Sequence, residues 1–166
     1  WDQWLSLHAP TGSSVGINGR SLSVRIADRL TSLLSPKGIS LREDLDLPSL
    51  IWNDRPAMPS STVFAYTLAP ESRQNKLSRL EAQLASLGAD SFMTSALDEI
   101  GWLTNLRASD VDFNPVFLSH FLLCRGKPML FIDETRLPAE LKDALLSDGF
   151  EVRPYAAFAD AIASLP

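Results

Sequence analysis

A proline-rich break divides the sequence into two stretches that each alternate strand and helix patterns. The octet 54–61 reads Asp-Arg-Pro-Ala-Met-Pro-Ser-Ser and interrupts all hydrophobic periodicity. Proline fixes φ and removes a backbone donor, so such a run ends regular structure and favours a linker. On both sides of this octet, apolar residues recur every second position, as in strands, and then every third or fourth position, as in helices. Two α/β units joined by a linker are therefore the economical interpretation.

Apolar spacing in the first third of the chain predicts a small α/β unit. Ile26, Leu30 and Leu34 recur at helical spacing, and Ser21 or Ser23 before them is a suitable N-cap. The elements expected in this unit are helix 1–9, strand 14–18, helix 22–35, strand 39–42 and helix 45–52.

Residues 62–166 predict a second, larger α/β unit. A leucine stripe with spacings of three and four begins at Leu77, which indicates a helix with one buried side and Lys76 on another face. Two β-rich runs, 116–124 and 129–133, flank Arg-Gly-Lys-Pro and predict a buried hairpin. The other elements expected are strands 62–67, 91–95 and 150–155, and helices that begin at residues 70, 97, 138 and 157.

Composition excludes several classes of protein. The single cysteine, Cys124, rules out an intramolecular disulfide and a cysteine-based zinc site, and it fits a reducing compartment. A formal net charge of -5 argues against a nucleic-acid surface. The uncharged stretch 56–70 holds three prolines, and it is shorter than the roughly 18 apolar residues of a membrane-spanning helix. Because the chain starts at Trp1 with no leader, we expect it to be a segment of a longer protein.

The sequence offers few groups for catalysis. His8 and His120 lie far apart, and His120 falls in an apolar run where a hydrogen-bonded structural role is expected. No Gly-x-Ser-x-Gly elbow or phosphate-binding loop is present, and Cys124 also falls within a predicted strand. We therefore predict no catalytic residue and no metal ligand in this chain.

The polar loop 105–114 is the best candidate for binding. It gathers Asn105, Arg107, Asp110 and Asn114 between a Trp-bearing helix and a buried strand. Polar groups on a loop held by a rigid scaffold often form binding sites. The alternative is structural, with Arg107 and Asp110 satisfying each other and the nearby backbone.

A long and specific family resemblance begins at residue 94. Segment 94–110 reads Thr-Ser-Ala-Leu-Asp-Glu-Ile-Gly-Trp-Leu-Thr-Asn-Leu-Arg-Ala-Ser-Asp, and 114–117 reads Asn-Pro-Val-Phe. Both resemble the central segment of Xaa-Pro aminopeptidases, or aminopeptidase P, in the creatinase/prolidase-like peptidases. Segment 50–56, Leu-Ile-Trp-Asn-Asp-Arg-Pro, is similar to the stretch between the two N-terminal domains of that family.

The resemblance implies an α/β fold of creatinase-like N-terminal domains, with a mixed β-sheet flanked by helices and a partial first α/β unit. Residues 1–55 would be the C-terminal part of the first domain, 56–61 a Pro-rich linker and 62–166 the second domain. The catalytic "pita-bread" domain would be absent. In the family that domain holds two divalent metal ions, usually manganese, on two Asp, one His and two Glu, none of which lies in this chain.

The resemblance also implies what the parent protein does. It would be a metallo-aminopeptidase that removes the N-terminal residue from peptides with proline second, and this chain, inactive alone, would shape substrate access and assembly. The expected partners are its own C-terminal catalytic domain, X-Pro peptides and a second copy in a full-length homodimer, in the cytoplasm, without nucleic acid or membrane. The alternative is a stand-alone peptide-binding or protein-interaction module on the same scaffold without hydrolase activity.

Arg107, Asp110 and Asn114 are the substrate-rim residues that this resemblance suggests. The family usually has glycine where this chain has Ala108. If that position needs a positive φ, Ala108 should destabilise or shift the loop and displace Arg107.

Overall fold

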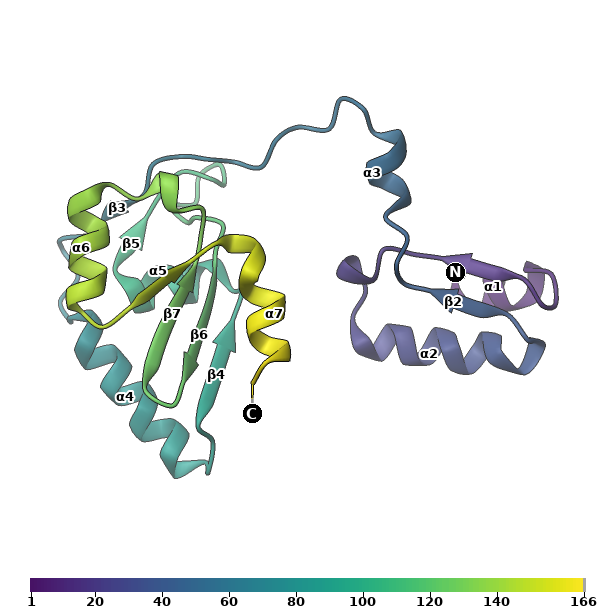
Figure 1. Cartoon of the computed structure of the whole chain (residues 1–166), viewed down its shortest axis with the longest axis horizontal. Helices are drawn as coiled ribbons and strands as arrows, with labels where there is room; N and C mark the ends of the chain where they lie inside the picture. The colour runs from purple at the N-terminus through teal and green to yellow at the C-terminus, as the bar shows by residue number, and fades with distance from the viewer. Residues whose placement is uncertain (166) are drawn as a thin grey trace. The chain divides into compact units, whose positions relative to one another are not determined.

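The chain divides into two units, Trp1–Ala57 and Met58–Pro166. The computed structural model describes residues 1–165, and Figure 1 shows the course of the chain. The division falls within the octet 54–61, and no helix or strand lies between Trp52 and Val63.

The first unit is built on a parallel strand pair. Its elements are α1 (Asp2–His8), β1 (Ser14–Gly16), the 3₁₀ helix η1 (Gly19–Ser21), α2 (Val24–Leu34), the 3₁₀ helix η2 (Ser35–Lys37), β2 (Ser40–Arg42) and α3 (Leu47–Ile51). Val15 pairs with Leu41 in parallel register because α2 returns the chain to the start of the sheet. Leu30 and Leu34 of α2 are buried with Ile39, as their spacing predicts.

Three tryptophans of the first unit are exposed. The exposed fractions are 66% for Trp1, 60% for Trp4 and 50% for Trp52. Trp4 stacks on His8 at 4.5 Å between ring centroids, and the Arg55 guanidinium lies 5.7 Å from the Trp52 ring centroid. These rings therefore lie on the surface of their unit rather than in its core.

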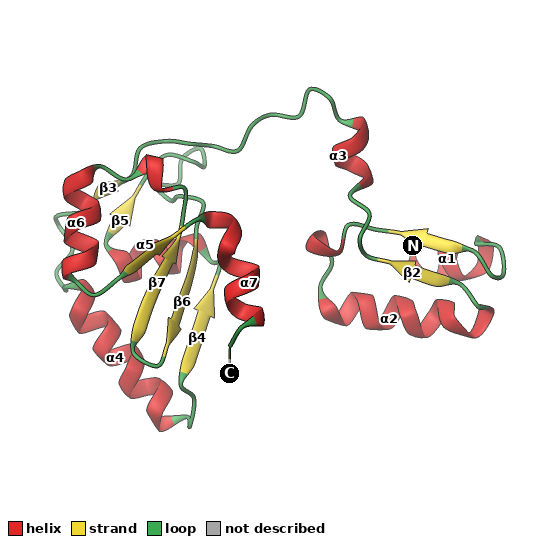
Figure 2. Ribbon diagram, in the orientation of Figure 1, coloured by secondary structure: helices red, strands yellow, loops and turns green. Residues whose placement is uncertain are grey.

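The second unit contains a four-stranded sheet and a separate strand pair, shown in Figure 2. Its elements are β3 (Phe64–Ala65), α4 (Arg73–Ser86), β4 (Ser91–Thr94), α5 (Leu97–Thr104), β5 (Leu106–Arg107), β6 (His120–Cys124), β7 (Lys127–Phe131), the 3₁₀ helix η3 (Glu134–Arg136), α6 (Ala139–Ser147), β8 (Glu151–Arg153), the 3₁₀ helix η4 (Tyr155–Ala157) and α7 (Phe158–Ala163). The sheet order is β4-β6-β7-β8, with β4/β6 and β6/β7 antiparallel and β7/β8 parallel. The fold is therefore α/β with a mixed sheet, as predicted.

Both faces of this sheet are covered. Phe121 and Leu123 of β6 join the core that α4, α5 and α6 complete, whereas Leu122 between them packs with Ala161 of α7. Successive side chains of a strand point to opposite faces, so α7 covers the face away from the other three helices. None of the described helices combines the length and apolar character needed to cross a bilayer.

Most predicted strands are shorter than expected, and two of them are shorter by four residues each. The 62–67 strand is reduced to β3, because Val63 N–H donates to Arg136 O (3.0 Å) instead of to a sheet neighbour. The 116–124 strand begins only at His120, since the chain before it closes the polar loop described below.

The predicted hairpin is confirmed with a tighter turn. Lys127 and Pro128, expected in the turn, are already part of β7. Pro128 lacks an N–H, but β8 pairs with β7 only from Met129 onward, so no ladder hydrogen bond is lost.

Candidate functional site

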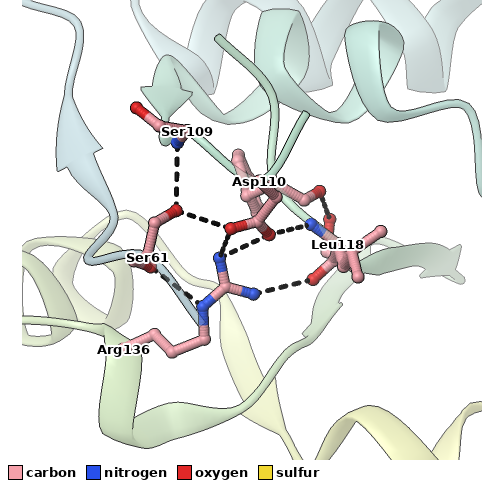
Figure 3. A network of polar contacts seen from close by, with 7 residues as sticks. Ser61, Ser109, Asp110, Leu118 and Arg136 are labelled. Carbon is pink, nitrogen blue, oxygen red and sulfur yellow. Dashed lines mark hydrogen bonds and ion pairs between the residues drawn. The ribbon is translucent and has the colours of Figure 1, made fainter. Parts of the chain in front are cut away.

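Asp110 lies in the loop between β5 and β6 with its side chain 0% exposed. Its carboxylate accepts hydrogen bonds from Arg136 Nη2 at 2.7 and 2.6 Å, from Ser61 Oγ at 2.5 Å and from Leu118 N–H at 2.7 Å (Figure 3). Ser61 Oγ in turn accepts from Ser109 N–H at 3.0 Å. A residue that the sequence placed in the linker is therefore part of the second unit's polar network.

Arg136 completes this network from η3. Its side chain is 4% exposed, and its Nε donates to Ser61 O at 3.0 Å. Figure 3 shows the guanidinium between Ser61 and Leu118, below the Asp110 carboxylate in this view. Three segments distant in sequence are thus held together by one buried ion pair.

The charge state of Asp110 follows from these contacts. Burial alone would raise the pKa of Asp110, but the hydrogen bonds from Ser61, Leu118 N–H and Arg136, with the charge of Arg136, hold that pKa below its ordinary value. An ionised, shielded carboxylate with all its partners internal cannot exchange a proton with a substrate. Asp110 therefore orders the loop.

Arg107 does not pair with Asp110, which corrects one half of the structural alternative drawn from the sequence; each side chain does bind nearby backbone. Its Nη1 donates to Gly101 O at 2.6 Å and to Leu106 O at 2.7 Å, and its guanidinium lies 4.9 Å from the Tyr66 ring centroid. Both hydrogen bonds use one nitrogen, so Nε and Nη2 make none with the described residues. Arg107 is half-buried and keeps donors that could bind a carboxylate or carbonyl oxygen.

Asn114 is exposed at the far side of the same loop. Its backbone N–H donates to Val111 O at 3.1 Å, and its carbonyl accepts from Val116 N–H at 2.8 Å. The three predicted rim residues are therefore a buried carboxylate, a half-buried guanidinium and an exposed amide, and the structure does not gather their side chains into one cluster.

Ala108 does not have the positive φ that was considered for this position. Among the described non-glycine residues, positive φ occurs at Asn105, Phe113 and Arg125. Ala108 is 0% exposed and its methyl group belongs to the main core. The alanine consequently fills core space without straining the backbone.

Lys76 is a polar residue whose role the sequence did not reveal. It was expected on an exposed face of α4, yet it is 3% exposed. Its Nζ donates to Trp102 O at 2.6 Å and Asn105 Oδ1 at 2.5 Å and lies 4.6 Å from the Trp102 ring centroid. Burial lowers the pKa of Lys76, partly opposed by the charge of Glu71. The lysine fixes the end of α5 from which Arg107 follows.

The two other candidate reactive groups have structural roles. A hydrogen bond of 2.7 Å joins His120 Nδ1 and Ser95 Oγ, and the imidazole stacks on Phe158 at 4.3 Å between ring centroids. Cys124 ends β6 and accepts from Ser91 Oγ at 3.4 Å. The hydrogen-bonded structural histidine is therefore as predicted.

Comparison with known proteins places this fold in a family. Residues 54–166 match the family model of the creatinase/prolidase N-terminal domain. The chain belongs to this family. This creatinase/prolidase N-terminal chain is 34% identical over 160 residues to a probable Xaa-Pro aminopeptidase P of Sordaria macrospora and 35% identical over 166 residues to one of Ajellomyces capsulatus.

These alignments cover 93% and 97% of this chain but only 26% and 27% of those proteins, so the chain spans about a quarter of the curated relatives it matches. The structure of X-prolyl aminopeptidase from Caenorhabditis elegans, a cytosolic enzyme with a di-nuclear active site, aligns with a TM-score of 0.85 at 21% identity. That alignment covers 98% of this chain and 27% of the enzyme. The predicted creatinase-like fold and family resemblance are confirmed.

A di-nuclear metal centre does not fit the residues of this creatinase/prolidase N-terminal chain. Within residues 1–165, no three His, Cys, Asp or Glu side chains are grouped so that they could hold a metal ion.

Proposed function

We propose that this chain is the non-catalytic N-terminal region of a metal-dependent Xaa-Pro aminopeptidase. Residues 1–55 form the C-terminal part of its first creatinase-like domain, 56–61 the linker and 62–166 the second domain, and the last linker residue, Ser61, is anchored on the second domain. The observation that carries this proposal is the identity of 34% and 35%, along nearly the whole chain, to proteins named probable Xaa-Pro aminopeptidase P. The chain spans only about a quarter of those proteins, so most of each relative lies outside the matched region.

The loop of Asp110 would shape access to the catalytic domain. The buried pair with Arg136 holds the loop in one conformation, while Arg107 and Asn114 contribute polar groups to the substrate rim. Fixed donors recognise a peptide at a smaller entropic cost than mobile ones, which is why a rigid loop suits this role. Asp110 would not contact the peptide itself; it would fix the loop conformation that positions the rim residues.

The rest of the enzyme would supply the chemistry. Two divalent metal ions, which we propose to be manganese, would lie in the catalytic domain outside this chain, and the full-length protein would be a cytoplasmic homodimer. The Caenorhabditis elegans enzyme is described as cytosolic and di-nuclear, which supports the proposed cytoplasmic location and the proposed number of metal ions.

The test is hydrolysis of X-Pro and matched X-Ala peptides by the full-length polypeptide that contains this chain. We expect release of the first residue from X-Pro peptides, its loss on chelation, its return with Mn²⁺, and no release by residues 1–166 alone. Peptide binding without hydrolysis by the metal-loaded polypeptide would instead identify the interaction module considered above.

A further inference from the structure

Phe113 combines an unfavourable backbone conformation with complete exposure. Its φ is 62°, and its exposed fraction of 106% means that no described residue packs against the ring. The left-handed conformation costs a residue with a Cβ roughly 1–2 kcal/mol. Packing of the ring against residues 1–165 does not offset this cost, because the ring is fully exposed.

The loop that presents Phe113 is rigid. Asp110 N–H donates to Val116 O at 3.2 Å, and Asn114 N–H donates to Val111 O at 3.1 Å, so the tip is closed by backbone bonds on both sides of the ring. The buried Arg136 guanidinium fixes the base through Asp110. The backbone that carries the exposed ring is therefore held in one conformation.

The surroundings of the ring indicate what it can contact. Val111 is 40% exposed beside it, and Asp112 makes no ion pair or hydrogen bond with the part of the chain that the structure describes. A complementary surface would offer an apolar pocket for the ring and a basic group for Asp112.

We propose that Phe113 docks into such a pocket on the catalytic part of the same polypeptide. This inference rests on the proposed function. A buried aromatic ring removes about 150–250 Å² from water, whereas a separate partner requires an interface of about 1,000 Å² or more. A covalently joined partner is present at an effective concentration of about a millimolar, so a single aromatic contact suffices. The relatives, of which this chain spans 26% and 27%, have the length to supply that surface.

Hydroxyl-radical footprinting of the wild-type full-length polypeptide, read by mass spectrometry, tests this without a substitution. Phe117 and Phe131, both 0% exposed, serve as buried references, and Phe64, 50% exposed, serves as a partly exposed one. Docking predicts that the oxidation rate of Phe113 is at least tenfold lower than that of Phe64 and close to the rates of Phe117 and Phe131. Oxidation of Phe113 faster than Phe64 would overturn the proposal.

Two further outcomes would also overturn it. Protection that develops only with rising protein concentration would identify a second copy as the occupant, and protection that requires an X-Pro peptide would identify the substrate.

The docking contact and the proposed activity can fail separately. Absence of X-Pro hydrolysis with Phe113 still protected would refute the proposed activity and leave the docking contact standing.

A substitution gives an independent readout. Asparagine tolerates the left-handed conformation, so Phe113→Asn keeps the loop and removes the ring. We expect it to lower the first thermal transition of the full-length polypeptide by several degrees. The matched control is Leu68→Asn, at a residue 79% exposed, which should leave the transition in place. Equal temperatures of the first thermal transition for Phe113→Asn and Leu68→Asn would contradict docking.

Discussion

Arg136 donates through Nη2 to both carboxylate oxygens of Asp110, at 2.7 and 2.6 Å, and the two side chains are 4% and 0% exposed. This pair joins residues 26 apart and fixes the loop that holds Asn114 and Phe113. Any variant that removes one partner leaves the other charge buried without compensation.

Asp110→Ala should therefore destabilise the second unit strongly. The expected loss is about 3–5 kcal/mol in the free energy of unfolding, because the Arg136 guanidinium remains buried and unpaired. Urea denaturation with matched m values measures it. Glu81→Ala, at an exposed residue of α4, is the control and should change stability by less than about 0.5 kcal/mol. Similar values for the two variants would show that the pair contributes little.

Gly101→Ala tests the close approach of Arg107 to α5. An added Cβ would lie 3.2 Å from Arg107 Nη1 and 3.3 Å from Leu106 O. The helix-propensity gain of about 1 kcal/mol should then be offset by displacement of the guanidinium. In an Arg107→Ala background the same change should be more favourable by at least about 0.5 kcal/mol, measured as a double-mutant cycle. Additive free energies would indicate that Arg107 moves away without cost.

Protonation of His120 should weaken the packing of α7 on the sheet. Burial of the imidazole against Phe158 lowers the pKa of His120 from the ordinary value of 6.5. The unfolded chain then takes up the proton first, so this contribution to stability is complete above pH 6.5 and is lost as the pH falls from there through the folded-state pKa. Urea denaturation at pH 7.5 and 5.0 should show a larger loss for the wild type than for His120→Asn. The same loss in both proteins would assign the effect to other groups.

Arg107→Ala in the full-length polypeptide tests the proposed substrate rim. If the free donors of Arg107 bind the peptide, KM for X-Pro peptides should rise about tenfold with kcat little changed, as expected for a charged hydrogen bond present in both ground and transition states. Arg125→Ala, at the exposed turn between β6 and β7, is the matched control. Unchanged kinetics on several X-Pro peptides would remove Arg107 from the rim.

Much of the fold was predictable because the signals are local. The leucine spacing from Leu77 predicted α4, the Arg-Gly turn predicted the β6/β7 hairpin, and the proline-rich octet predicted where regular structure stops. The motif from residue 94 predicted the family, since a motif is read directly along the chain. The loop of Asp110 was identified as polar and ordered for the same reason.

Only the tertiary structure decided which groups meet within that loop. Arg136 and Ser61 carry no local signal that marks them as partners of Asp110, and Lys76 looks like a solvated helix residue until Trp102 covers it. Sequence spacing fixes which side of one helix or strand a residue occupies, but not which distant segment packs there. The sequence thus determined the elements and the family, whereas long-range packing determined that Asp110 is a buried structural carboxylate and that Phe113 is left exposed.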